Sequence, residues 1–233
     1  VDVFLAPSRY LKNRFVRSFG LPEERVTYLD YGFHRERFCG RKREPEDTFT
    51  FGYIGTHIPA KGIHILIEAF AKLKGSAKLR IWGRHRSSTT PSLISKAEKL
   101  TKGSNLKVEW LEEYENENIV QHVFNRCDAI VVPSIWMENS PLVIHEAQQA
   151  RMPVITANAG GMAEYVRDGV NGLLFEHRSP EGLARKMQMF IDNPARAVAL
   201  GERGYLYSND GQVPSIEGHV RAVADIYRSV IKK

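Results

Sequence analysis

The chain has 233 residues, is 42% apolar and 26% charged, and carries a net charge of +6. These values are typical of a soluble globular protein that folds alone and prefers anionic partners. No apolar run approaches the roughly 20 residues of a membrane-spanning helix, and the spacing of the two cysteines indicates neither a disulfide framework nor a zinc site. The short basic runs lack the interleaved aromatic residues of a single-strand nucleic-acid binder. We therefore expect a cytoplasmic protein without a nucleic-acid partner; peripheral attachment to a membrane stays open for the full-length protein.

Strand-like and helical segments alternate along the chain. The first residues have the pattern of a strand and no initiator methionine, as in a piece of a longer protein. Amphipathic patterns predict helices around residues 10–19, 62–73, 119–124 and 215–231. Short runs rich in β-branched and aromatic residues predict strands. These runs lie at residues 26–29, 49–54, 78–82, 106–110, 129–132, 153–156 and 172–175.

This alternation predicts parallel βαβ units with right-handed crossovers. The expected fold class is α/β, with a Rossmann-like open parallel sheet and helices on both faces. Ligands of such sheets bind at the carboxyl ends of the strands. We expect residues 47–213 to form this domain, after an N-terminal and crossover segment at 1–46 and before a closing helix at 214–233.

A glycine-rich turn follows the strand at 49–54. Gly55, Lys61 and Gly62 precede a predicted helix, whose free amides favour anions, and a lysine there adds a positive charge for phosphate. The spacing matches neither the P-loop nor the dinucleotide-binding motif. An ordinary strand-to-helix turn and a phosphate site therefore both stay open at this point.

The stretch PSIWMENSPLVIHEA places two glutamates eight positions apart. Glu138 lies in the loop after the strand at 129–132. Ser140 has the chemistry of a helix N-cap and Pro141 suits the first helical position, so Glu146 is expected almost two turns into a helix that ends near residue 150. The two carboxylates could bind different parts of one elongated ligand, whose anionic middle would lie at the helix N-terminus. The alternative is a solvated Glu138 and a Glu146 that pairs with a basic group.

Gly160 and Gly161 follow the strand at 153–156 and open another predicted helix. They would add a second set of free amides at the same edge of the sheet. Two predicted helices thus start at glycines, and a third starts between two glutamates. All three starts follow the ends of strands, and together they indicate a ligand that carries a diphosphate.

Motifs across most of the chain resemble the donor-binding half of the family-4, or group 1, retaining glycosyltransferases. Glu138 and Glu146 match the E-x7-E motif of that family. The turn from Gly55 to Lys61 is similar to its G-R-x-x-x-x-K-G turn, and VTYLDYGFHRERF is similar to its crossover I-P-N-G-V-D-x-x-x-F. Further matching residues are Pro133, Ser134, Pro141, Leu142, Val143, Ala147, Pro153, Val154, Ile155, Gly160, Gly161, Glu164 and the segment 169–175.

The resemblance implies a GT-B architecture of two Rossmann-like domains, in which the C-terminal domain binds a nucleotide sugar and the N-terminal domain binds the acceptor. The family transfers sugar with retention, by a front-face route in which the leaving phosphate helps to deprotonate the acceptor. This route needs no cofactor, metal or protein nucleophile. The expected donor is a UDP- or GDP-sugar. Most of the N-terminal acceptor domain is missing from this sequence, so we expect this chain to bind donor without transferring sugar alone.

The resemblance also implies roles for single residues. Glu146 would bind the ribose hydroxyls, Glu138 the hydroxyls of the donor sugar, and Lys61 the diphosphate. The amides near Ser140 to Leu142 would bind the phosphates and the sugar. The catalytic residues implied are Glu138 and Lys61. The donor-binding residues implied are Gly55, Thr56, Lys61, Arg84, Asn139, Ser140, Pro141, Leu142 and Glu146.

Thr56 departs from the family pattern, which has an arginine at this position. A threonine supplies no bidentate cation to a leaving diphosphate. Arg84 and His57 are the candidate replacements. Two other functions stay open: a nucleotide-sugar epimerase of the same architecture, which needs acid and base groups in both domains, and a non-catalytic nucleotide-sugar-binding module.

Overall fold

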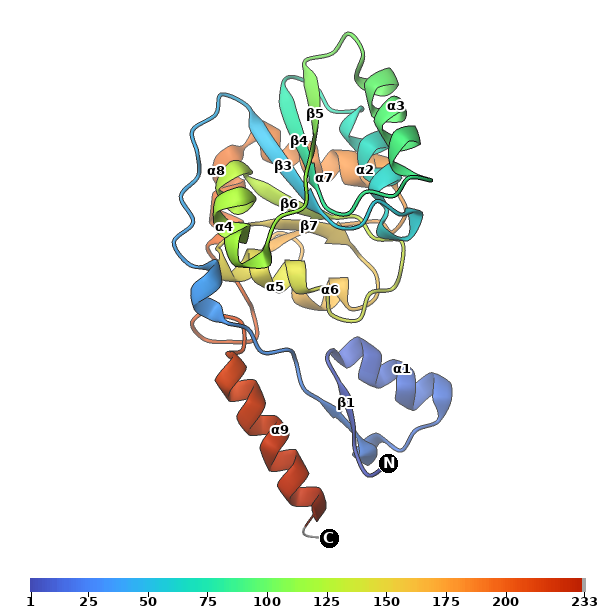
Figure 1. Ribbon diagram of the computed structural model, residues 1–233, viewed down its shortest axis with the longest axis vertical. Coiled ribbons are helices and arrows are strands. Elements are labelled where there is room, and N and C mark those ends of the chain that lie inside the picture. The colour runs from blue at the N-terminus through green and yellow to red at the C-terminus, as the bar shows by residue number, and fades with distance from the viewer. Residues whose placement is uncertain (232–233) are drawn as a thin grey trace.

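The structure is a computed structural model that describes residues 1–231. Figure 1 shows a main body built around a sheet, with a smaller group of elements below it. The strands are β1 (Phe4–Ala6), β2 (Val26–Tyr28), β3 (Phe49–Ile54), β4 (Ala77–Trp82), β5 (Leu106–Leu111), β6 (Ala129–Val132), β7 (Val154–Ala157) and β8 (Gly172–Phe175). The α-helices are α1 (Arg9–Phe19), α2 (Ile63–Phe70), α3 (Thr90–Thr101), α4 (Ile119–His122), α5 (Leu142–Gln149), α6 (Met162–Tyr165), α7 (Pro180–Asp192), α8 (Pro194–Gly201) and α9 (Ile216–Ile231).

The main body contains one parallel sheet of six strands in the order β5-β4-β3-β6-β7-β8. Its central strands are apolar on both faces, as β6 illustrates with the buried run AIV, because helices cover the sheet on both sides. α2 packs against α3 and α7, whereas α4 and α5 both contact the short turn Arg35–Phe38. The predicted fold class, a Rossmann-like open parallel sheet, is confirmed. The predicted strands agree with β2 to β8 to within one residue at each end.

The strand order reverses between β3 and β6, which are neighbours in the sheet. From β3 the chain adds β4 and β5 on one side, and then crosses back to add β6, β7 and β8 on the other. In open α/β sheets the crevice at such a reversal is where ligands bind. The loops that follow β3 and β6 meet at this point, so the fold brings the glycine-rich turn and the Glu138 loop together.

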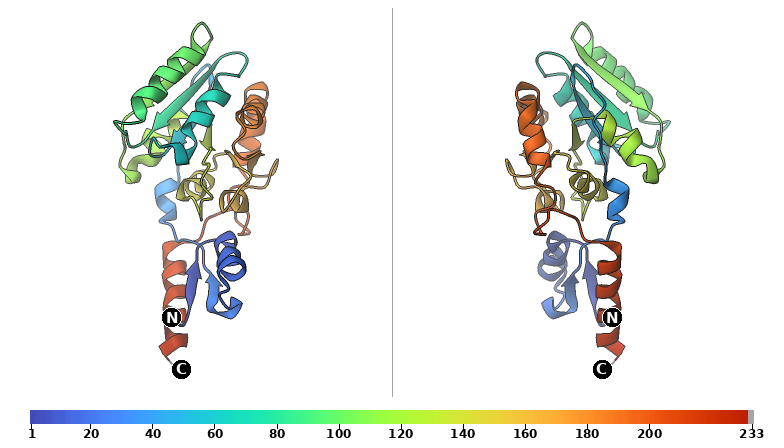
Figure 2. Two further views of the ribbon diagram at one scale, coloured as in Figure 1. Left: turned by 90° about the vertical axis from the view of Figure 1, so that its right-hand side faces the viewer. Right: turned by 90° about the vertical axis from the view of Figure 1, so that its left-hand side faces the viewer.

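The smaller group consists of the parallel pair β1–β2, helix α1 and helix α9 (Figures 1 and 2). Two chain segments connect it to the main body, and they bind each other: the Phe33 amide donates to the Pro214 carbonyl at 2.9 Å, and the Ile216 amide donates to the Phe33 carbonyl at 2.9 Å. We call residues 29–34 and 213–219 the joint. Among the described residues, no helix is both long and apolar enough to cross a membrane.

Candidate functional site

A cavity of about 590 Å³ opens beside the joint, where the crossover segment faces the loop after β6 and the start of α5. We call it the donor cavity, after the donor-binding residues predicted from the sequence that line it. Its lining residues are Tyr31, Gly32, Phe33, His34, Arg37, Phe38, Asn116, Trp136, Glu138, Asn139, Ser140, Leu142 and Glu146. Five predicted donor-site residues therefore share one cavity: Glu138, Asn139, Ser140, Leu142 and Glu146. The crossover residues and Asn116 are lining residues that sequence reasoning missed.

Glu138 is held by the turn that follows β3. The Lys61 ammonium group lies 2.7 Å from Glu138 Oε1, and the Ser134 hydroxyl donates to the same oxygen at 3.0 Å. The Glu138 side chain is 16% exposed and that of Lys61 is 41% exposed. The two implied catalytic residues thus form an ion pair at the reversal of strand order, with each charge partly neutralised by the other.

Glu146 is a buried carboxylate with few hydrogen-bond donors. It is 7% exposed, and the Asn116 side-chain amide donates to its Oε1 at a long 3.3 Å. Burial raises the pKa of Glu146, against the opposing effects of the Asn116 hydrogen bond and the charge of His145. A buried carboxylate is costly unless donors satisfy it. Two adjacent hydroxyl groups of a ligand in the donor cavity would supply such donors.

The start of α5 differs from the prediction. The helix begins at Leu142, the preceding Pro141 is at the N-cap position, and no side chain caps the helix. The predicted N-cap, Ser140, instead directs its hydroxyl to Asp30 Oδ1 at 3.4 Å. Ser140 lies one residue before the N-cap position and does not cap α5. Its hydroxyl instead connects the loop to the joint.

The turn between β3 and α2 is packed against the loop after β6. Gly62 has a φ of 71°, and a Cβ atom added there would lie 1.9 Å from the Pro133 carbonyl oxygen. The amides of Ile135 and Trp136 donate to the Ala60 carbonyl at 3.0 and 3.1 Å. Glycine is thus required at position 62 for both its conformation and its close contact, and this contact places Lys61 beside Glu138.

The first part of that turn is bound to the turn after β4. The Gly55 amide donates to the Trp82 carbonyl at 3.1 Å, and the His57 amide donates to the Arg84 carbonyl at 3.0 Å. The Thr56 carbonyl accepts a hydrogen bond from the Tyr53 hydroxyl at 3.2 Å. Five predicted site residues are not among those that line the donor cavity: Gly55, Thr56, Lys61, Arg84 and Pro141.

Neither proposed replacement for the missing arginine provides a cation to the donor cavity. The Arg84 side chain is 64% exposed and its Nε lies 3.6 Å from Glu113 Oε1. His57 is fully buried, its Nδ1 lies 3.2 Å from the Thr90 hydroxyl, and its ring packs beside Trp110. Burial, with the charge of His85 adding to it, lowers the pKa of His57 to about 4, so its ring is neutral at pH 7. The proposal that His57 supplies the charge is wrong.

The glycine pair before α6 also has a different role from the predicted one. The Gly161 amide donates to the Glu138 carbonyl at 2.7 Å, and a Cβ atom added at Gly161 would lie 1.6 Å from the Asn139 carbonyl oxygen. The amide expected to bind an anion is therefore already paired. A larger residue at position 161 would clash with this loop, because the loop that carries Glu138 lies directly on the start of α6.

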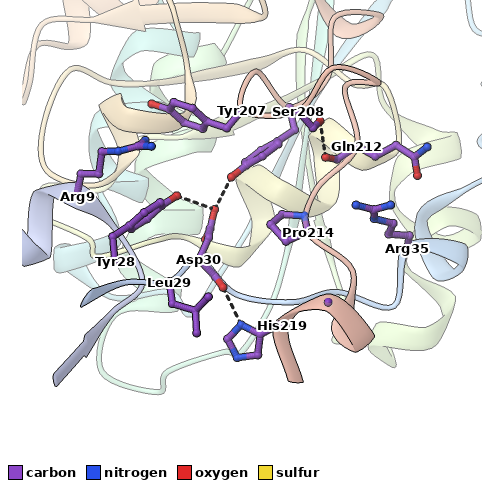
Figure 3. A pocket seen from close by; sticks show the side chains of 12 residues that line it. Arg9, Tyr28, Leu29, Asp30, Arg35, Tyr207, Ser208, Gln212, Pro214 and His219 are labelled. Atoms are coloured by element: carbon purple, nitrogen blue, oxygen red, sulfur yellow. Dashed lines mark hydrogen bonds between the residues drawn. The ribbon is translucent and has the colours of Figure 1, made fainter. Parts of the chain in front are cut away.

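Asp30 is an important residue of the joint that sequence reasoning did not single out. Its Oδ2 lies 3.1 Å from His145 Nε2 and accepts from the Tyr205 hydroxyl at 2.7 Å, and its Oδ1 accepts from the Tyr165 hydroxyl at 3.3 Å. His219 of α9 lies with its Nδ1 2.8 Å from the Asp30 carbonyl oxygen (Figure 3). The buried carboxylate thereby links the crossover segment to α5, α6 and the loop before α9, and the backbone carbonyl of Asp30 links it to α9.

A second cavity, of about 410 Å³, surrounds the exposed side of this network (Figure 3). Its polar side chains are largely paired within the protein. The Arg9 guanidinium lies over the rings of Tyr28 and Tyr207, 4.5 and 4.7 Å from their centroids, and the Ser208 hydroxyl donates to the Gln212 carbonyl at 2.7 Å. Because its groups satisfy one another, we interpret this cavity as part of the structural joint.

Glu164 provides a contact between the main body and the smaller group. Its Oε1 accepts from the Arg9 amide at 3.0 Å and its Oε2 from the Tyr10 amide at 2.9 Å, so it caps the start of α1. A carboxylate at this position also complements the helix dipole. The glutamate belongs to the motif noted above, but its partners lie more than 150 positions away, beyond the reach of any local pattern.

Comparison with known proteins decides the family. The model for glycosyl transferases group 1 matches residues 35–207. The chain belongs to the group 1 glycosyltransferases. One relative, an uncharacterized glycosyltransferase of Methanocaldococcus jannaschii, is 29% identical over 208 residues, which is 89% of this chain and 54% of the relative. The capsular polysaccharide biosynthesis glycosyltransferase CapM of Staphylococcus aureus is 27% identical over 86% of this chain and 55% of its own length.

Solved glycosyltransferases share this fold. HepE of Anabaena, determined in complex with UDP and glucose, superposes with a TM-score of 0.81 at 22% identity, over 98% of this chain and 64% of HepE. Sucrose-phosphate synthase of Thermosynechococcus elongatus gives a TM-score of 0.84 at 20% identity, over all of this chain and 59% of the synthase. This group 1 chain therefore spans somewhat more than half the length of its relatives. Residues 1–231 contain no group of three or more His, Cys, Asp and Glu side chains suited to a metal ion.

Proposed function

We propose that this chain is the donor-binding part of a glycosyltransferase that moves a sugar, with retention, from a nucleotide sugar to an acceptor. The observation that carries the proposal is the environment of Glu146. This carboxylate lines a cavity, is buried, and receives one long hydrogen bond from the described part of the chain. The two hydroxyl groups of a ribose are donors of the kind that it lacks.

The diphosphate of the donor suits the region between Glu146 and Glu138. The helix α5 starts at Leu142 without a side-chain cap. Its Ile144 amide donates to the Pro141 carbonyl at 3.0 Å, so the amides of Leu142 and Val143 are the ones available to an anion. Lys61 adds the positive charge. Glu138 and Asn139, at the other part of the same loop, are then placed for the hydroxyls of the donor sugar.

In the proposed reaction, the bond between the anomeric carbon and the diphosphate oxygen breaks, and the acceptor oxygen bonds to that carbon on the same face. The acceptor proton passes to the leaving phosphate. Lys61 and the α5 amides stabilise the charge that develops on the diphosphate. Neither a metal nor a protein nucleophile is needed for these steps. The acceptor and the complete activity belong, in this proposal, to the whole protein.

We propose UDP-sugars as the donors, because HepE, whose fold this chain shares, binds UDP and glucose; GDP-sugars are the alternative. Titration calorimetry with UDP, UDP-glucose and GDP-mannose tests both the site and the nucleotide. Glu146→Ala should weaken UDP binding at least tenfold, since a hydrogen bond to a charged group contributes about 1.5–3 kcal/mol. Glu117→Ala, an exposed neighbour outside the cavity, is the matched control and should leave the dissociation constant unchanged.

Lys61→Ala should also weaken UDP binding about tenfold, and the loss should shrink as salt is added. Lys102→Ala, at an exposed position, controls for the change in net charge. A folded Lys61→Ala variant with the parental dissociation constant would exclude the turn as the phosphate site and leave the α5 start as the anion holder. Unchanged binding in Glu146→Ala would contradict the proposal as a whole.

A further inference from the structure

A smaller cavity, of about 320 Å³, adjoins the donor cavity on the side of α1. α1 contributes Tyr10, Leu11 and Arg14, the loop after β6 contributes Trp136 and Asn139, and the loop after β8 contributes Arg178. Trp136 and Asn139 line both cavities, and Glu138 lies between them in the sequence. We call this space the α1 cavity. A group bound there would lie next to the sugar-binding end of the donor cavity.

The charged side chains of the α1 cavity are both arginines. Arg178 has no hydrogen-bond or ion-pair partner within residues 1–231, and Arg14 donates only to the neutral hydroxyl of Tyr10, at 2.9 Å. No carboxylate is among the lining residues given by the described chain. Both arginines are at exposed positions, so their guanidinium groups are accessible to a ligand. Each offers the planar set of donors that binds a phosphate or carboxylate group.

The loop that carries Arg178 is fixed against the loop that carries Trp136. His177 Nε2 lies 3.1 Å from the Ile135 carbonyl oxygen. Arg178 itself has a φ of 64°, a conformation that glycine adopts more easily than any other residue. An arginine therefore stands at a position whose backbone conformation favours glycine.

The floor of the α1 cavity is apolar and exposed. Trp136 is 66% exposed and Met137 is 40% exposed, although both lie in a loop held by hydrogen bonds. An indole ring in this position offers a flat surface to a sugar or other ring. The cavity therefore combines a surface for a ring with two cations for an anionic substituent.

We propose that the α1 cavity binds the acceptor, and that the acceptor carries a phosphate or carboxylate group held by Arg14 and Arg178. This proposal rests on the proposed function, because it takes the neighbouring cavity to be the donor site. The same anionic chemistry is found in a soluble sugar phosphate and in the headgroup of a lipid, so the experiment has an arm for each.

Phenyl phosphate, a ring that carries one phosphate group, is the probe for the soluble arm. Its binding is measured by calorimetry, with and without saturating UDP, and by quenching of the Trp136 fluorescence, for which Trp136→Phe is the blank. We expect binding that persists in the presence of UDP and weakens as salt is added. Benzyl alcohol, the neutral counterpart, should bind at least tenfold more weakly.

Two substitutions locate the anion. Arg178→Gly suits the local backbone, so the variant should fold, and it should weaken phenyl phosphate binding at least tenfold. Arg14→Gln should have a similar effect. Arg221→Gln, at an exposed position of α9, changes the net charge equally and should change nothing.

For the lipid arm, sedimentation with phosphatidylcholine vesicles that contain phosphatidic acid should show binding that Arg178→Gly abolishes if a lipid headgroup is the source. Phenyl phosphate binding without vesicle binding identifies a soluble acceptor. The proposal would be overturned if Arg178→Gly and Arg14→Gln bound phenyl phosphate and the vesicles as the parental chain does. Displacement of phenyl phosphate by UDP would also overturn it. If the parental chain bound phenyl phosphate but not UDP, the result would count against the proposed function. Phenyl phosphate binding would still report on the α1 cavity in that case.

Discussion

Lys61 and Glu138, for which we propose contacts to neighbouring parts of the donor, bind each other across 2.7 Å. A nucleoside diphosphate without a sugar must compete with Glu138 for the lysine, and it also meets the negative charge of the glutamate. A donor with its sugar attached satisfies both side chains at once. We therefore propose that the ion pair favours the sugar-bearing nucleotide over the nucleoside diphosphate product.

Glu138→Gln tests this interpretation. The substitution frees Lys61, so UDP should bind about two- to fivefold more tightly, which corresponds to the roughly 0.5–1 kcal/mol of a partly exposed ion pair. The preference for UDP-glucose over UDP should fall. Calorimetry at low salt measures both effects, with Glu117→Gln as the control. Weaker UDP binding in the variant would mean that the carboxylate supports the diphosphate site.

Asp30 is the residue on which the joint depends. Burial raises the pKa of Asp30, but the hydrogen bond from His145, the charge of His145 and the Tyr205 hydroxyl together outweigh burial, so the pKa lies below its ordinary value. A carboxylate with a lowered folded-state pKa stabilises the protein above its unfolded-state pKa, and this stability is lost as the pH falls through the folded-state value.

Asp30→Asn should therefore lower the free energy of unfolding at pH 7 by on the order of 3 kcal/mol, since it leaves buried partners without their counter-charge. The difference from the parental chain should shrink below about pH 4, where the unfolded-state carboxylate is protonated. Urea unfolding at several pH values measures it. Asp225→Asn, on the exposed side of α9, should cost less than about 0.5 kcal/mol. A pH-independent loss would show that packing, and not charge, holds the joint.

At the scale of elements, the site depends on how closely the start of α2 approaches the loop after β6. Gly62 and Gly75 both have positive φ values, of 71° and 85°. A Cβ atom at Gly62 would lie 1.9 Å from the Pro133 carbonyl oxygen, whereas one at Gly75 would meet nothing within 4 Å. The two positions thus separate the effect of backbone conformation from the effect of close contact.

Gly75→Ala should destabilise the chain by about 1 kcal/mol, the usual cost of a left-handed conformation for a residue with a Cβ atom. Gly62→Ala carries that cost and must also push two loops apart, so its loss should be at least about 2 kcal/mol larger. Thermal unfolding compares the two variants. Calorimetry should further show weaker UDP binding for Gly62→Ala alone. Equal losses at the two positions would argue against a tight contact between α2 and the loop.

At the scale of the whole molecule, the chain combines a well-packed main body with a smaller group that buries little. The apolar core contains residues of every strand from β3 to β8, while neither α1 nor α9 has a buried residue. The chain also spans little more than half of its relatives. In our proposal, donor binding needs only the main body and the joint, whereas transfer needs a complete acceptor site, of which the α1 cavity would hold only the anionic group.

We accordingly expect this chain to bind UDP-glucose and to release no UDP from it in the presence of phosphorylated or neutral sugar acceptors. A coupled assay for released UDP, run beside calorimetry on the same preparation, measures both properties. Turnover above the background of the Glu146→Ala variant would show that these residues contain a complete active site. Absence of both binding and turnover would instead count against the donor cavity.

Local patterns in the sequence were enough for the strands of the main sheet and for the fold class, although α3, α7 and α8 were not predicted. The strand runs at 49–54, 129–132 and 172–175 coincide with β3, β6 and β8, because alternation and apolar content reflect contacts between residues that are close in the chain. The family motif similarly marked Glu138 and Glu146, which the donor cavity brings together. Ser140 was misassigned because cap chemistry alone does not determine at which residue a helix begins.

The tertiary structure alone decided which distant residues meet. Lys61 reaches Glu138, 77 positions away, only because β3 and β6 are neighbours in the sheet. Asp30 contacts His145 and Tyr205 because the joint brings them together, and the Gly161 amide donates to the Glu138 carbonyl. Such contacts depend on strand order and on the packing of loops over one another, for which a single sequence contains no periodic signal. The residue types at the site could therefore be predicted from the sequence, while their pairing, burial and charge balance are consequences of the packed fold.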